Sequence, residues 1–238
     1  MILLDRVTDS PRVFGKRRPL LDEATLTLPQ GRYALLSERP EMHRALIDVL
    51  AGLRPPRTGL VLHEGLVSWP LGRQGFIRGR ATGEQMIAFV CALYRIDVRA
   101  CTALVSDLIT SPEFLAARME HWPLYVRQEF SFALGLAPPF DIYVIEGAIP
   151  FEPCRFTRLW QALFEDRLAG RTLILSTYRQ NQMTDYCVKG LVHERHGFRI
   201  DSELERCIAQ FPNRQSRTGS GSGGGDEPLA GSDVDVGI

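Results

Sequence analysis

The sequence predicts an α/β fold built on a mixed core sheet, with a helical lobe inserted into it. Two short apolar segments, 141–145 and 172–176, are typical of strands buried on both faces inside a parallel sheet. A helical pattern over 154–168 lies between them and is closed by Gly170. The stretch at about 97–137 has helical spacing throughout, and this predicts the lobe.

The first part of the chain predicts strands that alternate with helices. The expected elements are strands at 2–7, 24–28 and 33–36, a helix over 41–52, short strands near 60–62 and 66–69, and a helix over 83–94. The last of these follows from the spacing of Met86, Ile87, Val90 and Leu93. A turn rich in Arg, Pro and Gly joins the first two strands.

In the second part, the helical pattern of the lobe is broken at Pro112 and at Trp122-Pro123. After the strand at 172–176, the expected elements are a helix near 180–186, strands at 188–193 and 197–200, and a helix over 202–210. Residues 1–212 are therefore expected to form one domain. Residues 213–238 are rich in Gly and Ser and then acidic, which predicts a disordered tail.

Composition excludes several classes of function. The 238 residues carry 28 basic and 28 acidic side chains, so net charge gives no argument for nucleic acid as a partner. The five cysteines are scattered without a CxxC pair and predict reduced thiols in a cytoplasmic protein. His193 and His196 are read as part of a turn, so no metal site is expected. No apolar segment is long enough to predict a membrane span or a signal peptide.

The segment 31–59 has the outline of a phosphate-binding unit: a short strand, a turn, a helix and a proline-rich exit. In a working phosphate-binding loop, glycines curl the backbone around the phosphates, a lysine reaches them, and a hydroxyl holds magnesium. The turn here has none of these residue types at the required positions, and Pro40 removes an N–H donor. The turn consists of Ser37, Glu38, Arg39, Pro40, Glu41, Met42, His43 and Arg44.

Several strings resemble a known family. They are 67–72 (VSWPLG), Gly79, 82–83, 89–94 (FVCALY), 140–145 (FDIYVI) and 186–187. Together with the order of elements, they resemble the ATP-binding subunit of bacterial ABC exporters for capsular polysaccharide. The resemblance covers about residues 1–210 and implies the P-loop NTPase-like fold of an ABC nucleotide-binding domain. It also implies that this chain is a degenerate member.

Nearly all of the family's working residues are replaced at the matching positions. The phosphate lysine becomes His43, and the magnesium-binding hydroxyl residue becomes Arg44. The other replaced positions are the adenine-stacking aromatic near Pro11, the sensing glutamine at Arg78, the signature at Pro123, Leu124 and Tyr125, the magnesium aspartate at Glu146, the general base at Gly147, and the switch histidine at Tyr178. Loss of one preorganised electrostatic element typically costs about a hundred- to a thousandfold in rate. No catalytic residue is expected intact, so hydrolysis by this chain's own motifs is expected to be close to nil.

Two function classes remain. In the first, the chain is an ATPase-deficient subunit that docks on the membrane permease of a polysaccharide exporter, as a homodimer or paired with an intact ATP-binding subunit. In the second, it is an active ATPase with atypical motifs that energises the same export. ATP and Mg²⁺ are ligands only if residual binding survives. The resemblance places the protein in the cytoplasm, peripheral on the inner membrane through the permease, with 78–83 and 89–94 near the contact.

The replaced residues also suggest a pairing. Arg44 opens the helix after the turn, and Glu146 ends a neighbouring buried strand. One hypothesis is that the guanidinium of Arg44 takes the place of the metal and pairs with Glu146, since a buried charge needs a partner. The alternative is that both side chains are solvated. For His43, the alternatives are a phosphate contact and local packing or hydrogen bonding.

Overall fold

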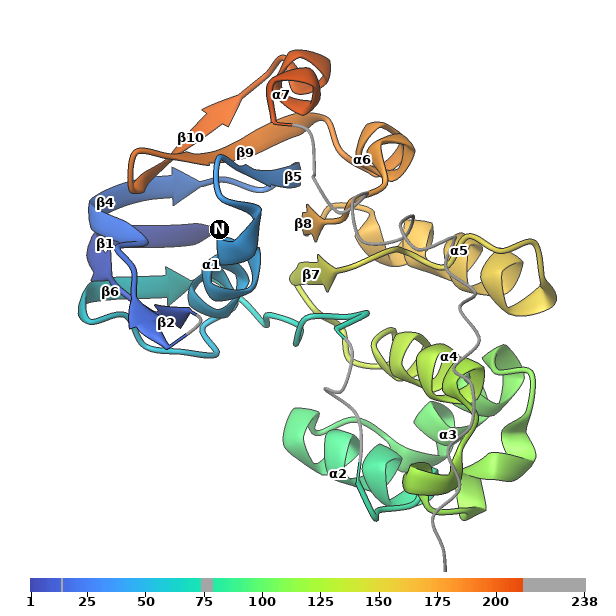
Figure 1. Cartoon of the computed structure of the whole chain (residues 1–238). Helices are drawn as coiled ribbons and strands as arrows, with labels where there is room; N and C mark the ends of the chain where they lie inside the picture. The colour runs from blue at the N-terminus through green and yellow to red at the C-terminus, as the bar shows by residue number, and fades with distance from the viewer. Residues whose placement is uncertain (14, 74–78, 212–238) are drawn as a thin grey trace, which may run out of the picture.

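The computed structural model describes residues 1–13, 15–73 and 79–211. Its N-terminal part contains a three-stranded antiparallel sheet in the order β4-β1-β6. These strands are β1 (Ile2–Asp9), β4 (Leu21–Leu28) and β6 (Thr58–His63). A hairpin of β2 (Arg12–Val13) and β3 (Lys16–Arg17) follows β1, and Figure 1 shows β2 near β6.

The second sheet holds the strands that position the candidate site. Its order is β10-β9-β5-β8-β7. Four strands run parallel, β5 (Arg32–Ser37), β7 (Ile142–Glu146), β8 (Thr172–Ser176) and β9 (Lys189–Glu194), and β10 (Gly197–Asp201) is antiparallel to β9. Because the carboxyl ends of parallel strands meet at one edge of a sheet, the residues that follow β5, β7 and β8 share that edge.

One helix lies between the two sheets, and three others gather in a separate group (Figure 1). A 3-10 turn, η1 (Pro40–Met42), leads into α1 (His43–Leu50), which lies between the two sheets. The helices α2 (Gly83–Tyr94), α3 (Val98–Leu108) and α4 (Leu124–Leu134), with the turns η2 (Pro112–Ala116) and η3 (Met119–His121), gather away from α1. The remaining helices are α5 (Arg155–Leu168), α6 (Gln180–Tyr186) and α7 (Leu204–Gln210).

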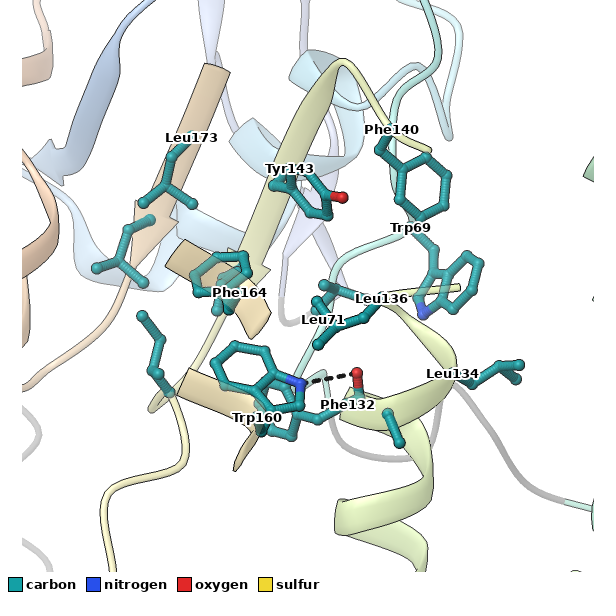
Figure 2. Close-up of a cluster of buried hydrophobic side chains, with 14 of the residues drawn as sticks. Trp69, Leu71, Phe132, Leu134, Leu136, Phe140, Tyr143, Trp160, Phe164 and Leu173 are labelled. Carbon is teal, nitrogen blue, oxygen red and sulfur yellow. Dashed lines mark hydrogen bonds between the residues drawn. The ribbon is translucent and has the colours of Figure 1, made fainter. Parts of the chain in front are cut away.

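The second sheet is buried on both faces, as the apolar runs predict. Ile142 and Val144 of β7 belong to the core that contains α1, while Tyr143 and Ile145 face the core under α4 and α5. Figure 2 shows this second core, in which the indole N–H of Trp160 donates to the backbone oxygen of Phe132 at 2.9 Å. That bond satisfies the one polar atom of a fully buried tryptophan and ties α5 to α4.

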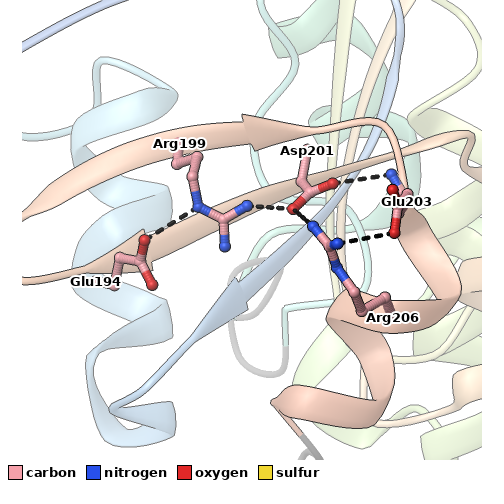
Figure 3. A network of polar contacts seen from close by, with 5 residues as sticks. All are labelled: Glu194, Arg199, Asp201, Glu203 and Arg206. Carbon is pink, nitrogen blue, oxygen red and sulfur yellow. Dashed lines mark hydrogen bonds and ion pairs between the residues drawn. The ribbon is translucent and has the colours of Figure 1, made fainter.

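A polar network fixes the C-terminal helix (Figure 3). Arg199 of β10 donates to Glu194 at 3.0 Å and to Asp201, and Arg206 of α7 reaches Asp201 at 3.2 Å. The backbone N–H of Glu203 also donates to Asp201, at 2.9 Å, and with the two arginines holds the pKa of that carboxyl well below its usual range. Asp201 therefore joins the end of β10 to α7.

The structure confirms the predicted α/β order, while several element ends shift by up to three residues and one strand, one helix start and one hairpin differ in kind. The expected strand at 66–69 makes only isolated bridges, from Val67 and Leu71 to β7, because Pro70 and Gly72, with φ +81°, interrupt extended pairing. The expected helix over 41–52 begins as η1 at Pro40 and its α-helical part ends at Leu50. The short β2–β3 hairpin was not predicted.

Candidate functional site

The turn between β5 and α1 is held by its own polar groups. His193 Nε2 lies 2.8 Å from the backbone oxygen of Leu20, which can only accept, so Nε2 carries the proton. Nδ1 of His193 therefore accepts from the Ser37 hydroxyl, at 3.0 Å. The Ser37 oxygen in turn accepts from the backbone N–H of Arg39 at 3.0 Å. These three contacts fix the start of the turn against β9 and against Leu20, the residue before β4.

Most of the backbone N–H groups expected to face a phosphate have protein partners instead. The N–H of Glu38 donates to the oxygen of His193 at 3.3 Å, and that of Met42 donates to the oxygen of Arg39 at 2.9 Å. The N–H of His43 donates to the oxygen of Pro40, and Pro40 itself has none. With the Arg39 bond already described, four donors of this turn are bonded internally. A phosphate cradle requires such donors to point at the ligand.

His43 occupies the lysine position as a neutral side chain. Its Nδ1 lies 2.9 Å from the hydroxyl of Ser176 at the end of β8, while Nε2 is buried with no hydrogen-bond partner among the described residues. Burial, and then the nearby His193, lower the pKa of His43 to about 4. At neutral pH this position therefore carries no positive charge, which agrees with the local alternative in the sequence analysis.

Glu146 has a buried arginine partner, but that partner is Arg73. The Nε of Arg73 donates to Glu146 Oε2 at 2.6 Å, and Nη1 donates to Asp48 Oδ1 at 2.6 Å. The Arg73 side chain is only 6% exposed, while the two carboxylates are 23% and 22% exposed. One guanidinium thus bridges α1 and the end of β7, beside the position where the resembled family holds magnesium.

The predicted Arg44–Glu146 pair is therefore wrong. Arg44 is exposed and forms no ion pair with any described residue. The physical reason is the path of the segment before Arg73. Leu71 accepts a hydrogen bond from the N–H of Glu146 at 2.8 Å and donates its own N–H to Val144 at 2.9 Å. This pairing along β7 brings Arg73 to the carboxylate, while Arg44 points to solvent.

The general-base and switch positions, Gly147 and Tyr178, carry neither a carboxylate nor an imidazole. Gly147 has φ +108°, a value that favours glycine, and it contributes only backbone, with its N–H bonded to Ser176 at 2.8 Å. Tyr178 is 48% exposed after the end of β8. Beside it, the guanidinium of Arg179 lies 3.4 Å from the centre of the Phe151 ring.

The signature positions lie at the start of α4, in the separate group of helices (Figure 1). Pro123 precedes the helix, and Leu124 and Tyr125 are 59% and 50% exposed. The structure does not bring them to the turn of the same chain. Arg78 lies outside the described residues. Near it, α2 begins with a capping box between Thr82 and Gln85.

Two properties of the described chain bear on cofactors and membranes. Within residues 1–13, 15–73 and 79–211, no group of three or more His, Cys, Asp or Glu side chains is arranged to hold a metal ion. Over the same ranges, no helix has the length and apolar character needed to cross a bilayer.

The sequence analysis missed four residues that shape this site: Asp48, Arg73, Ser176 and His193. For Arg73, the available signal was an arginine next to Gly72 in a segment expected to lie beside the core sheet. His193 was expected at the end of a strand, entering a turn; the structure places it in β9, and its burial was not predicted.

With this geometry described, the chain can be compared with known proteins. No family model matches it. It is 29% identical over 217 residues to the ATP-binding protein BexA of Haemophilus influenzae, which covers 90% of this chain and all of that protein. It is 27% identical over 180 residues to the capsule polysaccharide export ATP-binding protein CtrD of Neisseria meningitidis serogroup B; this alignment covers 75% of this chain and 83% of CtrD. Identity to the polysialic acid transport ATP-binding protein KpsT of Escherichia coli is 21% over 195 residues, with 81% and 87% covered.

Solved structures show the fold. An ATP-binding subunit of an ABC transporter superposes with a TM-score of 0.70 at 13% identity, covering 90% of this chain and 95% of that one. An ATP-binding cassette solved as a dimer in a post-hydrolysis state, bound to ADP and Pi, superposes with a TM-score of 0.64 at 13% identity. This superposition covers 85% of this chain and 98% of that one. The predicted fold is confirmed: the chain has the α/β fold of ABC ATP-binding cassettes.

Proposed function

We propose that this protein is the cassette subunit of an ABC transporter that exports capsular polysaccharide, and that it does not itself hydrolyse ATP. The export role is supported by similarity along most of the chain to BexA and CtrD, of which CtrD is named for capsule polysaccharide export. The cassette fold supports a role in an ABC transporter.

The observation that supports the absence of hydrolysis is the bridge made by Arg73. A guanidinium held at 2.6 Å from both Glu146 and Asp48 supplies a fixed positive charge where a magnesium ion would neutralise phosphate oxygens. For a metal to take this place, Arg73 would have to leave both carboxylates, and its guanidinium, which is only 6% exposed here, would need a new partner or solvent. The neutral His43 and the internally bonded N–H groups of the turn also oppose the binding of a phosphate group.

The second candidate is an active ATPase with atypical motifs. The comparisons favour it, because the relatives are named as ATP-binding proteins and match 75–90% of this chain. In that case, nucleotide binding would have to displace Arg73 from Glu146 and free the donors of the turn.

The proposed partners follow from the same comparison. A membrane permease would hold the protein at the cytoplasmic face of the inner membrane, with the exposed Phe89 and Leu93 of α2 near the contact. The chain would act as a homodimer, or as a heterodimer with an intact ATP-binding subunit. In a heterodimer, the partner would supply the hydrolysis.

Complementation in the source cell tests both parts of the proposal. Deletion of this chain is expected to abolish surface polysaccharide, and both the wild-type protein and Glu146→Gln are expected to restore it. Glu146→Gln keeps the size of the side chain while removing its charge, and immunoblotting controls for its abundance. Unchanged surface polysaccharide after deletion would refute the export role. Failure of Glu146→Gln at normal abundance would instead support the active ATPase.

A further inference from the structure

Four arginines line one pocket on the antiparallel side of the molecule. An open cavity of about 400 Å³ lies between the end of β1, the β2–β3 hairpin and the segment that joins α1 to β6. Figure 1 shows β2 in this region, near β6 and α1. The residues that line the cavity are Asp9, Ser10, Arg12, Arg17, Arg54, Pro55 and Arg57. Neither the turn 37–44 nor Glu146 lines it, whereas Pro11, near the family's adenine-stacking position, lies between two of its lining residues.

The charge of this cavity is not balanced by the protein. Four arginines and one aspartate give it a formal charge of +3. Asp9 is only 5% exposed, and Arg54 binds both of its carboxylate oxygens, at 2.8 and 2.5 Å. The negative charge of Asp9 is therefore neutralised by Arg54. The other three arginines, Arg12, Arg17 and Arg57, form no ion pair with a described carboxylate.

The backbone fixes these free arginines close together. Arg12 and Arg17 are directly opposite each other in the hairpin, a cross-strand pairing of like charges that destabilises a hairpin. The N–H of Arg18 closes the hairpin on the oxygen of Pro11 at 3.0 Å, and the N–H of Arg57 bonds to the oxygen of Thr8 at 3.0 Å. The arrangement therefore keeps like charges beside one cavity at a cost that a bound anion would relieve.

We propose that this cavity binds a phosphate-bearing anion. A single carboxylate is satisfied by one guanidinium, as Asp9 already shows. Several guanidinium groups around one cavity suit a group with more than one charge and several acceptor oxygens, and the planar guanidinium matches phosphate in a bidentate manner. The phosphate can come from a small soluble molecule or from a lipid headgroup. Because the arginines are exposed, the affinity falls as salt is added.

Calorimetric titration with pyrophosphate, which carries phosphate without a base, tests the site. The full chain is compared with Arg12→Gln/Arg17→Gln and with a matched control, Arg99→Gln/Arg158→Gln. The control removes the same charge from exposed positions on α3 and α5. Wild type and control are expected to bind alike, and the cavity variant is expected to bind at least about tenfold more weakly.

Sedimentation with vesicles distinguishes the source of the phosphate. Vesicles of phosphatidylcholine with and without phosphatidylglycerol are used with the same three proteins. If only phosphatidylglycerol vesicles bind, and the cavity variant alone loses that binding, the headgroup is the source and the proposal stands. The proposal is overturned if neither probe binds, or if the control double variant loses as much binding as the cavity variant. These outcomes do not depend on whether the protein hydrolyses ATP.

Discussion

The replacement Arg73→Met tests whether the bridge between α1 and β7 stabilises the fold. Methionine keeps most of the length of the side chain but removes the cation, leaving Glu146 and Asp48 without their partner. Breaking a fully buried pair costs about 3–5 kcal/mol. The two carboxylates here are 22% and 23% exposed, so water recovers part of that loss. We expect the free energy of unfolding to fall by about 2–3 kcal/mol at neutral pH.

Urea denaturation followed by tryptophan fluorescence and circular dichroism measures this change. The matched control is Arg80→Met, since Arg80 is 87% exposed and lies 3.9 Å from Glu120. The control should change stability by less than about 0.5 kcal/mol. The double variant Arg73→Met/Glu146→Gln should recover part of the loss, because it no longer carries an unpaired Glu146 charge. If Arg73→Met is as stable as the control, the bridge contributes nothing measurable and the reasoning fails.

Three further predictions concern other parts of the fold. His43 has a folded-state pKa of about 4 against 6.5, so its contribution to stability is complete above pH 6.5 and is lost as pH falls through 4. Wild type should therefore lose up to about 3 kcal/mol more than His43→Gln between these pH values, and parallel denaturation curves would contradict this. Gly59→Ala places a Cβ 2.3 Å from the Arg6 oxygen at φ +82°, whereas Gly197→Ala meets nothing within 4 Å. The first should destabilise by about 1–3 kcal/mol and the second by much less, and equal melting temperatures would refute the argument. Trp160→Phe removes the bond to Phe132 and leaves a void, so denaturation should show a loss of about 2–4 kcal/mol, and a loss below about 0.5 kcal/mol would contradict the packing in Figure 2.

The order of elements could be predicted because the relevant signals are local. The apolar runs that became β7 and β8, and the helical spacing of α2, depend on neighbouring residues only. The β2–β3 hairpin escaped prediction because strands of two residues carry no periodicity. The segment 66–69 looked like a strand, but its apolar residues make only isolated bridges to β7.

The site could be predicted only in part. The residue types at the turn and at the end of β7 showed directly that the usual phosphate and metal ligands are replaced. Which arginine pairs with Glu146 could not be read locally, since Arg73 reaches it through pairing between segments about seventy residues apart. The role of His193 was hidden for the same reason, because its contact with Ser37 spans 156 positions.

Phosphate release from ATP by the purified chain is the measurement that tests the central claim most directly. It is made with Mg²⁺, with and without the candidate partner subunit, and with Glu146→Gln as the matched variant. We expect the isolated wild type to be indistinguishable from both Glu146→Gln and a blank without protein. Turnover by the wild type alone that requires Mg²⁺ and disappears in Glu146→Gln would contradict the account and establish the protein as an active ATPase.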